Sequence, residues 1–258
     1  MQAQSDNPRM RLDELLVARG FFASRSRARD AIQRATVHVD GRLAAKAGEG
    51  VLATAEIAVD DPARNYASRA ALKLIAALDA FSLDPAGREA LDLGASTGGF
   101  TQVLLERGAR HVTAIDVGHG QLHERIAADP RVTCIEGLNV RDLKQGDLGG
   151  HAPDFLTADL SFISLKLALP PALQLAAPGA RGVFLVKPQF EAGREALGKG
   201  GILRNPADGG RIAEELREWL DGQPGWHAIG LVHSPIEGGD GNREYLLVGA
   251  KDSGVKDK

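Results

Sequence analysis

The chain has 258 residues and a formal net charge of −3, with 43% hydrophobic and 25% charged residues, a composition typical of soluble globular proteins. No apolar stretch of signal-peptide length stands at the N-terminus, and no uninterrupted apolar run approaches the ~18–20 residues of a bilayer span. The single cysteine, Cys134, excludes an internal disulfide and a cysteine-based zinc site. We therefore expect a cytoplasmic protein with no membrane segment and no metal.

Positive charge is concentrated near the N-terminus. Residues 9–46 hold nine Lys or Arg against four acids, a local net charge of +5, so the remaining residues sum to −8. A basic segment joined to an acidic body indicates a polyanionic partner, although a solvated helix face would have the same composition.

Residues 9–60 are predicted to form a small α+β domain. The leucine spacing predicts a helix from Leu12 that stops at Gly20, and Ser24 is expected to cap a second helix. The second helix turns four side chains inward and its arginines outward; the inward residues are Ala28, Ala31, Ile32 and Ala35. Strands are predicted at 37–39, followed by an Asp-Gly turn, and at 56–59.

The run RLDELLVARGFFASRSRARDAIQRATVHVDG, residues 11–41, resembles a small RNA-binding domain first seen in a ribosomal small-subunit protein. In that family an arginine-bearing helix meets the RNA backbone. The resemblance implies that four arginines contact phosphates: Arg25, Arg27, Arg29 and Arg34. Guanidinium groups suit phosphate oxygens and give affinity without reading the base sequence.

Strands and helices alternate in the rest of the chain. Turn-forming residues predict a linker at 61–67, followed by a second domain at 68–250 and a disordered tail at 251–258. Strands are predicted at 90–93, 111–117, 132–136, 155–160 and 182–187, and helices from the loop at 94–99 to about 107 and at 120–129, 165–177 and 207–221. This alternation predicts an α/β fold with a mostly parallel sheet, closed by an antiparallel hairpin of 228–233 and 244–249.

The loop DLGASTGGF after the first of these strands indicates a ligand site. Its glycines do not match the dinucleotide fingerprint, because Ser96 stands at the third position, and no Gly-Lys-Ser/Thr ends the loop as a phosphate loop requires. Asp116 ends the next strand, where a carboxylate can accept hydrogen bonds from a ribose diol. The layout resembles the S-adenosylmethionine site of Rossmann-like methyltransferases and favours it over a dehydrogenase site, which the loop alone leaves open.

Several methyl-transfer chemistries are disfavoured. The residues after the fourth strand, Asp159-Leu160-Ser161-Phe162, lack the Pro-Pro pair that usually accompanies methylation of exocyclic amines. Methylation of pyrimidine carbon 5 needs a cysteine, and Cys134 lies within a predicted strand, where inert core packing is expected. Phe162 either packs in the core or stacks on an RNA base.

Lysines and carboxylates are predicted at the strand ends and on the helix that enters this domain: Lys73, Asp159, Lys187 and Glu244. A ribose 2′-hydroxyl is a very weak acid, so its methylation calls for a base. A lysine can take that part when burial and a neighbouring cation lower its pKa, while acids orient the pair.

The motifs SRAALKL, DLGASTGGFT, ADLSFISL, LVKPQFE and NREYLL, in this order, are similar to those of the TlyA family of FtsJ-related ribosomal RNA 2′-O-methyltransferases, some first called hemolysins. The resemblance implies a Rossmann-like class I methyltransferase fold and cytidine ribose methylation of ribosomal RNA or ribosomal subunits. It implies that Lys187 is the base, that Asp159 and Lys73 position and polarise the substrate, and that Glu244 completes the site.

The resemblance also implies a set of residues that bind S-adenosylmethionine: Asp92, Gly94, Ala95, Ser96, Gly98, Gly99, Phe100, Asp116, Asn139 and Asp159. One departure from the family is Ala70-Ala71, where two glycines are common, and it could alter the approach of Lys73. Two other functions stay open: a membrane-active cytolysin, and a ribosome-assembly factor with a vestigial catalytic site.

Overall fold

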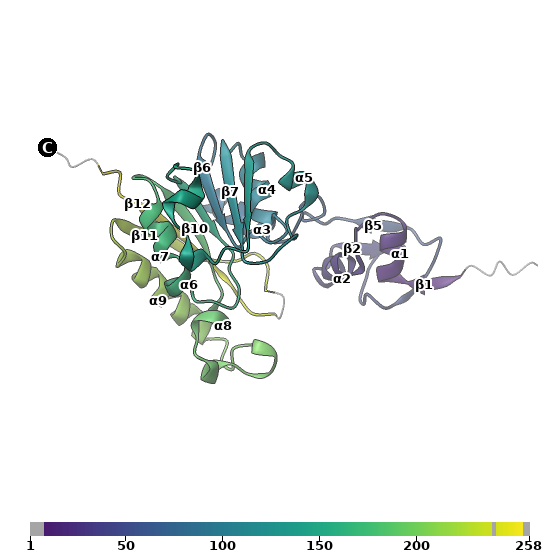
Figure 1. Ribbon diagram of the computed structural model, residues 1–258. Coiled ribbons are helices and arrows are strands. Elements are labelled where there is room, and N and C mark those ends of the chain that lie inside the picture. The colour runs from purple at the N-terminus through teal and green to yellow at the C-terminus, as the bar shows by residue number, and fades with distance from the viewer. Residues whose placement is uncertain (1–7, 239–240, 255–258) are drawn as a thin grey trace, which may run out of the picture. The chain divides into compact units, whose positions relative to one another are not determined.

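The chain separates between Asn65 and Tyr66 into two units in the computed structural model, which describes residues 8–238 and 241–254 (Figure 1). Unit 1 contains two helices and two small sheets, and unit 2 contains a seven-stranded sheet with helices on both faces. The predicted α/β fold with a small N-terminal α+β unit is confirmed.

Unit 1 is built on the helices α1 (Leu12–Ala18) and α2 (Arg25–Gln33). Ser24 caps α2 as predicted, since its hydroxyl accepts a hydrogen bond from the backbone N–H of Arg27 at 3.3 Å. Gly20 follows α1 with a φ of +73°, the left-handed conformation that ends a helix. The strands β2 (Val37–Val39), β3 (Arg42–Leu43) and β5 (Ile57–Val59) form one sheet, and β1 (Arg9–Arg11) pairs with β4 (Gly50–Leu52) in another.

One predicted core position in unit 1 is wrong. Ala35 lies beyond the end of α2, is exposed, and has a φ of +60°. The helix stops at Gln33, so the helical spacing that would have turned Ala35 inward no longer applies. The residues that do form the core include Leu12, Leu16 and Ala28.

The sheet of unit 2 has the strand order β11-β12-β10-β9-β6-β7-β8. Its strands are β6 (Glu89–Leu93), β7 (His111–Asp116), β8 (Val132–Glu136), β9 (Phe155–Ala158), β10 (Arg181–Val186), β11 (Trp226–His233) and β12 (Tyr245–Lys251). β6 to β10 are parallel, and β12 runs antiparallel to both β10 and β11. The predicted terminal hairpin is confirmed; residues 239 and 240 of its loop lie outside the described residues.

Helices cover the two faces of this sheet (Figure 1). One apolar cluster joins α3 (Ala71–Ala80) and α4 (Gly99–Glu106) to the sheet, and α5 (Glu124–Ala127) contributes Ile126. The other joins it to α6 (Leu165–Ala168), α7 (Pro170–Leu175) and α9 (Asp208–Asp221). Short elements complete the unit: η1 (Val140–Asp142), η2 (Gln145–Leu148), α8 (Pro188–Glu191), η3 (Arg194–Ala196) and η4 (Lys199–Gly201).

Two predicted helices are shorter or broken in the structure. The stretch 165–177 forms α6 and α7 instead of one helix, because Pro170 and Pro171 have no N–H to continue the helical hydrogen bonds. The stretch 120–129 is helical only in α5, and Gly120 before it has a φ of +64°, which a right-handed helix does not allow.

Two other expectations about unit 2 are corrected. Cys134 is exposed rather than packed in the core, because β8 is the edge strand of the sheet. The expected tail begins too early, since Lys251 is the last residue of β12 and its ammonium donates hydrogen bonds to carbonyl oxygens of Leu173, Gln174 and Ala176. Residues 255–258 of that predicted tail lie outside the described part of the chain.

Candidate active site

The carboxyl ends of three central parallel strands and the start of β12 lie side by side, at the same end of the strands. Each carries one predicted functional residue: Glu244 before β12, Lys187 after β10, Asp159 after β9 and Gly94 after β6. The register places Tyr245 opposite Val186, so Glu244 and Lys187 are neighbours at the end of the β10 and β12 pair. Sheet order thus brings together residues that are far apart in the sequence.

Lys187 is held by two polar groups from the loop after β9. Its Nζ lies 2.6 Å from Asp159 Oδ1 as an ion pair and donates a hydrogen bond to Ser161 Oγ at 2.9 Å. The lysine is 9% exposed, and Asp159 Oδ1 is a buried oxygen whose partner is the Lys187 ammonium group. Because a buried carboxylate needs compensation, the ion pair fixes the ammonium group beside it.

Lys73 and Glu244 form a second ion pair. Lys73 lies in the first turn of α3 and its Nζ donates to Glu244 Oε2. The two residues are 5% and 3% exposed. Ala70-Ala71 leaves this contact in place, so the lysine reaches its partner without the two glycines that the family commonly carries. All four predicted catalytic residues are therefore paired, three of them next to strand ends and Lys73 on α3.

A pocket of about 160 Å³ opens beside these pairs. It is lined by the glycine turn, the start of α3 and the strand ends: Gly94, Ala95, Ser96, Thr97, Gly99, Phe100, Ser68, Ala70, Asp159, Ser161 and Lys187. Six of the predicted cofactor residues are among them. Ser68, Ala70, Thr97 and Ser161 were missed, although all four lie inside the motifs that indicated the site.

Gly94 is required by the close approach of two chain segments. It has a φ of +81°, and a Cβ there would lie 2.7 Å from the carbonyl oxygen of Asp159. A side chain would therefore strain the backbone and displace the Asp159 loop. The glycine keeps the turn after β6 against the end of β9, where the pocket opens.

Asp116 supports the same turn from the next strand. Its Oδ2 accepts a hydrogen bond from the N–H of Ser96 at 2.8 Å, and its Oδ1 accepts one from Gly118 at 2.7 Å. Ser96 is exposed and has a φ of +47°. Since each carboxylate oxygen has two lone pairs, Asp116 can still accept hydrogen bonds from a diol.

Asp92 does not reach the pocket. It is fully buried, and its carboxylate accepts hydrogen bonds from the hydroxyl groups of Thr101 at 2.7 Å and Thr157 at 2.9 Å. Burial raises the pKa of Asp92 to about 6, although both hydrogen bonds act in the opposite direction. Asp92 therefore supports the turn from below, which differs from the predicted contact with the cofactor.

Three other predicted cofactor residues have local structural roles. Gly98 starts α4 with a φ of +96°, and a Cβ there would lie within 3 Å of Leu122 and Ile126. Phe100 lines the pocket but is 3% exposed and belongs to the core between α3 and the sheet. Asn139 caps η1 through its side-chain oxygen, which accepts from Arg141 N at 3.1 Å. The role of Asn139 in binding adenine stays a prediction.

Phe162 is exposed next to the catalytic pair. Its side chain is 90% exposed, so the expectation of core packing is wrong. Its backbone has a φ of +65°, which is rare for a bulky residue and is found mainly at functional sites. The ring packs against Phe190, with centroids 5.0 Å apart, and Lys187 Nζ lies 6.0 Å from the Phe190 centroid.

The predicted RNA-binding arginines of unit 1 are engaged with acids. Arg25 and Arg29 are exposed, yet both donate to Asp13 Oδ2, at 3.1 and 2.9 Å. Asp13 is fully buried, and Arg11 also donates to it. Burial acts to raise the pKa of Asp13, but the hydrogen bonds from the arginines outweigh it and hold that pKa well below its usual range.

Arg34 does not point outward as predicted. Its side chain is 15% exposed and pairs with Asp61 at 2.7 Å and with Asp30 at 3.0 Å. Arg27 is half-buried and donates to the carbonyl oxygen of Ala63 at 3.2 Å. These arginines therefore help to hold unit 1 together, and their contacts with RNA stay a prediction.

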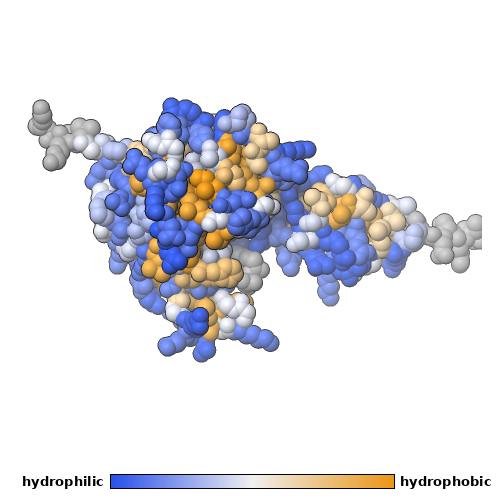
Figure 2. All heavy atoms as spheres, in the orientation of Figure 1, coloured by the Kyte–Doolittle hydropathy of each residue, from blue (hydrophilic) through white to orange (hydrophobic). Residues whose placement is uncertain are grey.

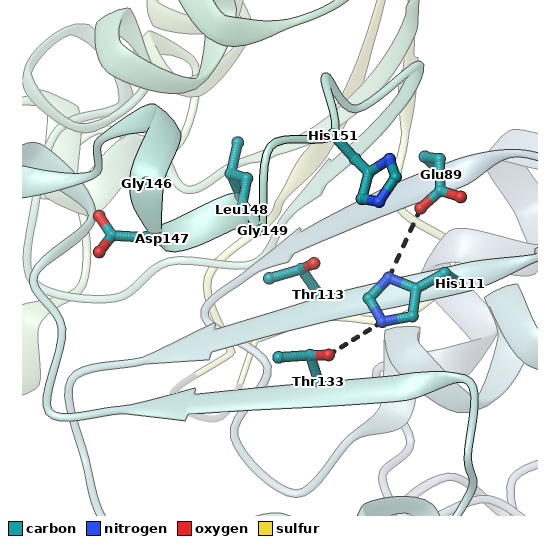
Figure 3. A pocket seen from close by; sticks show the side chains of 9 residues that line it. All are labelled: Glu89, His111, Thr113, Thr133, Gly146, Asp147, Leu148, Gly149 and His151. Atoms are coloured by element: carbon teal, nitrogen blue, oxygen red, sulfur yellow. Dashed lines mark hydrogen bonds and ion pairs between the residues drawn. The ribbon is translucent and has the colours of Figure 1, made fainter.

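A second, larger pocket of about 500 Å³ lies at the start of the parallel strands, at the opposite edge of the sheet (Figure 3). His111 stands at its centre, with Nε2 2.9 Å from Thr133 Oγ1 and Nδ1 3.5 Å from Glu89 Oε2. None of the predicted catalytic residues lines this pocket. Of these two pockets, the larger one therefore lies away from the predicted catalytic residues.

Within the described residues, no group of three or more His, Cys, Asp or Glu side chains is arranged to hold a metal ion. The helices of the same residues are too short or too polar to span a bilayer.

Two family profiles match the chain, each to one of its units. Residues 10–57 match the S4 domain, and residues 66–251 match the FtsJ-like methyltransferase. Together they account for the two units that the structure separates between Asn65 and Tyr66.

Curated proteins and a solved structure are similar over nearly the whole chain. The 16S/23S rRNA (cytidine-2′-O)-methyltransferase TlyA of Mycobacterium tuberculosis is 45% identical over 93% of this chain and 89% of its own. YqxC of Bacillus subtilis, by name a candidate rRNA methyltransferase, is 40% identical over 92% of this chain and 84% of its own. The structure of a candidate hemolysin from Streptococcus thermophilus is similar at a TM-score of 0.73 and 38% identity, covering 95% of this chain and 90% of that one.

Proposed function

The chain belongs to the TlyA family, in which an S4 domain precedes an FtsJ-like methyltransferase domain, and from this premise we propose that it methylates a cytidine ribose 2′-hydroxyl of ribosomal RNA. The methyl donor is S-adenosylmethionine. The substrate is free ribosomal RNA or a ribosomal subunit, which would place the protein in the cytoplasm.

The observation that carries the proposal is the pairing of two lysines with two acids beside the glycine-turn pocket. Lys187, Asp159 and Glu244 lie next to neighbouring strand ends, Lys73 reaches Glu244 from α3, and Lys187 and Asp159 also line the pocket. A site for ribose methylation needs both a place for the donor and basic groups next to the hydroxyl. Both features occur here at one edge of the sheet.

The residues of the pocket fit the donor. Asp116 keeps lone pairs free for the ribose diol, and Gly94 lets the turn that lines the pocket pack against the end of β9. Asp159, whose Oδ1 pairs with Lys187, lines this pocket and supplies negative charge next to the space for a positively charged donor. S-adenosylmethionine, when bound, supplies the methyl group on a sulfonium centre.

In its neutral form, after the ammonium that pairs with Asp159 has released one proton to solvent, Lys187 would take the proton of the ribose hydroxyl. Its Nζ is anchored by Asp159 and Ser161, so the group cannot drift away from the pocket. Lys73 and Glu244 hold the neighbouring position and keep the local charge balanced. Orientation of the hydroxyl relative to the donor accounts for much of the remaining rate.

Labelled methyl transfer tests this function. Purified protein is incubated with ribosomal RNA or subunits and labelled S-adenosylmethionine, and the modified nucleotide is mapped. We expect label in an alkali-resistant ribose linkage. Label on a base would contradict the proposal, and leakage of protein-free liposomes would support the cytolysin instead. A catalytically dead variant that restored ribosome assembly in a deletion strain would favour the assembly factor.

The variant K187R tests the assigned base. An arginine keeps the positive charge beside Asp159 but stays protonated, so we expect methyl transfer to fall at least ~100-fold, the lower range for loss of a general base. Binding of S-adenosylmethionine, followed by calorimetry, is expected to remain. A K187R enzyme with wild-type turnover would rule out proton transfer by Lys187.

A further inference from the structure

A small lobe of unit 2 leaves the sheet immediately after the catalytic strand β10. It consists of residues 192–206, between α8 and α9, and we name it the basic lobe (Figure 1, below α8). Its two ends are joined by a bridge between Leu197 and Leu203 and by a hydrogen bond from Arg204 N to Ala196 O at 2.9 Å. The lobe therefore begins five residues after Lys187, at the edge of the sheet where the pocket opens.

The basic lobe carries a net charge of +2, from three cations and one acid. Arg194, Lys199 and Arg204 are exposed, and Glu195 is the only acid in the lobe. None of the ion pairs found in the described residues involves these three cations, in contrast to the paired arginines of unit 1. Hydrophilic side chains stand out from this part of the surface in Figure 2. In a chain with a net charge of −3, such a cluster indicates an anionic partner.

Asn242 connects the basic lobe to the turn before β12. It is 4% exposed, and its side chain accepts a hydrogen bond from Leu203 N at 3.3 Å and donates one to Gly201 O at 3.2 Å. Leu203 is itself buried against the core of unit 2. A single buried amide therefore satisfies two backbone groups of the lobe, which would otherwise be unpaired at its base.

The same turn presents Glu244 to Lys73. The backbone carbonyl of Asn242 accepts a hydrogen bond from Gly238 N at 2.9 Å, and a Cβ on Gly238 would lie 2.7 Å from Glu244 Oε1. Gly238 thus leaves the space that the catalytic carboxylate occupies. The position of the lobe and the position of Glu244 both depend on the residues around Asn242.

We propose that the basic lobe binds phosphates of the RNA strand next to the target nucleotide, and that Asn242 is the positioning residue that holds the lobe in register with the Lys73–Glu244 pair. This inference rests on the proposed function, because it assumes that RNA enters the pocket beside Lys187. Phosphate contacts by these side chains add affinity and orientation without reading sequence.

Removal of the positive charges of the basic lobe tests whether the lobe binds RNA phosphates. The full-length variant R194Q/K199Q/R204Q is compared with R88Q/R107Q/R110Q, which removes the same charge at the other end of the sheet from arginines that are ion-paired and at least partly exposed. For the lobe variant we expect KM for RNA to rise about tenfold, kcat to stay within about twofold, and the slope of log Kd against log salt to flatten by about two. Equal KM, Kd and salt slope in the two variants would overturn the proposal.

Substitution of Asn242 tests whether this residue holds the basic lobe in register with the Lys73–Glu244 pair. N242A removes both hydrogen bonds to the lobe, and N242D keeps the acceptor but loses the donor to Gly201 O. We expect both variants to raise KM for RNA severalfold and to lower kcat. We also expect R194Q/K199Q/R204Q to raise KM by a smaller factor in the N242A background than in the wild type. Loss of thermal stability with unchanged KM, or strictly additive effects, would show that Asn242 is merely structural.

Direct RNA binding separates this inference from the proposed function. Fluorescence anisotropy with a labelled ribosomal RNA fragment measures Kd without methyl transfer. If the wild-type protein binds RNA but transfers no methyl group, the proposed function fails while weaker binding by the lobe variant still supports the lobe as an RNA contact. If the lobe and control variants bind equally well, the lobe proposal fails whatever the activity of the wild type.

Discussion

At the scale of single residues, burial and exposure assign opposite roles to side chains near the pocket. Asp92 is fully buried and bonded to two threonines, whereas Phe162 is 90% exposed beside the catalytic lysine. The first supports the fold of the turn, and the second contacts Phe190 yet stays exposed on a strained backbone. Phe162 leads to a prediction about RNA binding, and Asp92 leads to a prediction about the pH dependence of stability.

Phe162 is expected to stack on a base of the RNA. Replacement by alanine removes the exposed ring, and because stacking contributes about 1–3 kcal/mol per base, we expect KM for RNA to rise about tenfold. The variant F162W keeps a ring and is expected to retain activity. Steady-state kinetics with ribosomal RNA measures both, with I229A, a change at an exposed position of β11, as the control. A KM in F162A equal to that of I229A would contradict the stacking role.

Asp92 is expected to make the stability of unit 2 depend on pH. Its pKa is about 6 in the folded protein against 3.8 for an unperturbed carboxyl, so the folded state binds its proton more tightly than the unfolded state. The resulting stabilisation is complete below pH about 4 and is lost as pH rises to about 6, by up to about 3 kcal/mol. The variant D92N does not titrate and should lack this change.

Urea unfolding between pH 4 and pH 7.5 measures the effect. Both tryptophans, Trp219 and Trp226, lie in unit 2, so their fluorescence reports on that unit. The difference in unfolding free energy between wild type and D92N should decrease as pH rises from 4 to 6. A difference that is constant over this range would show that Asp92 titrates normally.

At the scale of elements, α1 and α2 are joined by charge as well as by apolar contact. Asp13 on α1 is buried and receives hydrogen bonds from Arg25 and Arg29 on α2. A buried carboxylate left without partners is costly, so these arginines cannot be removed without effect on the fold. A test of their role in RNA binding has to separate the two effects.

The variant D13N provides that separation. In the wild-type background, R25Q/R29Q is expected to destabilise unit 1, since the buried charge of Asp13 would keep only Arg11 as a partner. In the D13N background, the same two substitutions leave no buried charge. We then expect RNA binding still to weaken and its salt dependence to flatten, as about one counterion is released per phosphate contact.

Circular dichroism and anisotropy at several salt concentrations measure stability and RNA affinity side by side. If D13N/R25Q/R29Q binds RNA like D13N alone at every salt concentration, the two arginines act only within unit 1. A pH effect is also expected in the wild type: the lowered pKa of Asp13 gives stability that is present above pH about 4 and lost as pH falls further.

At the scale of the whole molecule, two units of different chemistry are joined in one chain. Unit 1 matches an S4 domain and concentrates arginine, and unit 2 matches an FtsJ-like methyltransferase and holds the paired lysines. The basic lobe adds unpaired cations to the catalytic unit itself. RNA affinity is therefore expected to depend on both units, which is why the tests above use the full-length protein.

Much of the architecture could be predicted from local sequence. Ser24 caps α2, Gly20 ends α1 in the left-handed conformation, and each predicted strand of unit 2 is found within a few residues of its expected bounds. Gly94, Asp159, Lys187 and Glu244 follow or precede those strands as expected. Cap residues, turn glycines and apolar runs act through their immediate neighbours, so the chain order alone is enough to reveal them.

Other features depend on which elements become neighbours. Cys134 is exposed because β8 is the edge strand, and strand order is not written in the strand itself. Ser161 and Asn242 owe their roles to partners that are distant in sequence. Ser161 contacts Lys187, and Asn242 contacts the basic lobe. Proline and glycine also shortened two helices whose apolar spacing had suggested greater length.

The sequence by itself determined the identities and the order of the reactive groups: a glycine turn, an acid one strand later, and two lysines and two carboxylates in the motifs that surround them. Only the tertiary structure decided which of these groups meet, because charge pairing follows sheet order and register. It paired Lys187 with Asp159 and Lys73 with Glu244, buried Asp92 below the turn, and engaged the arginines of α2 with Asp13.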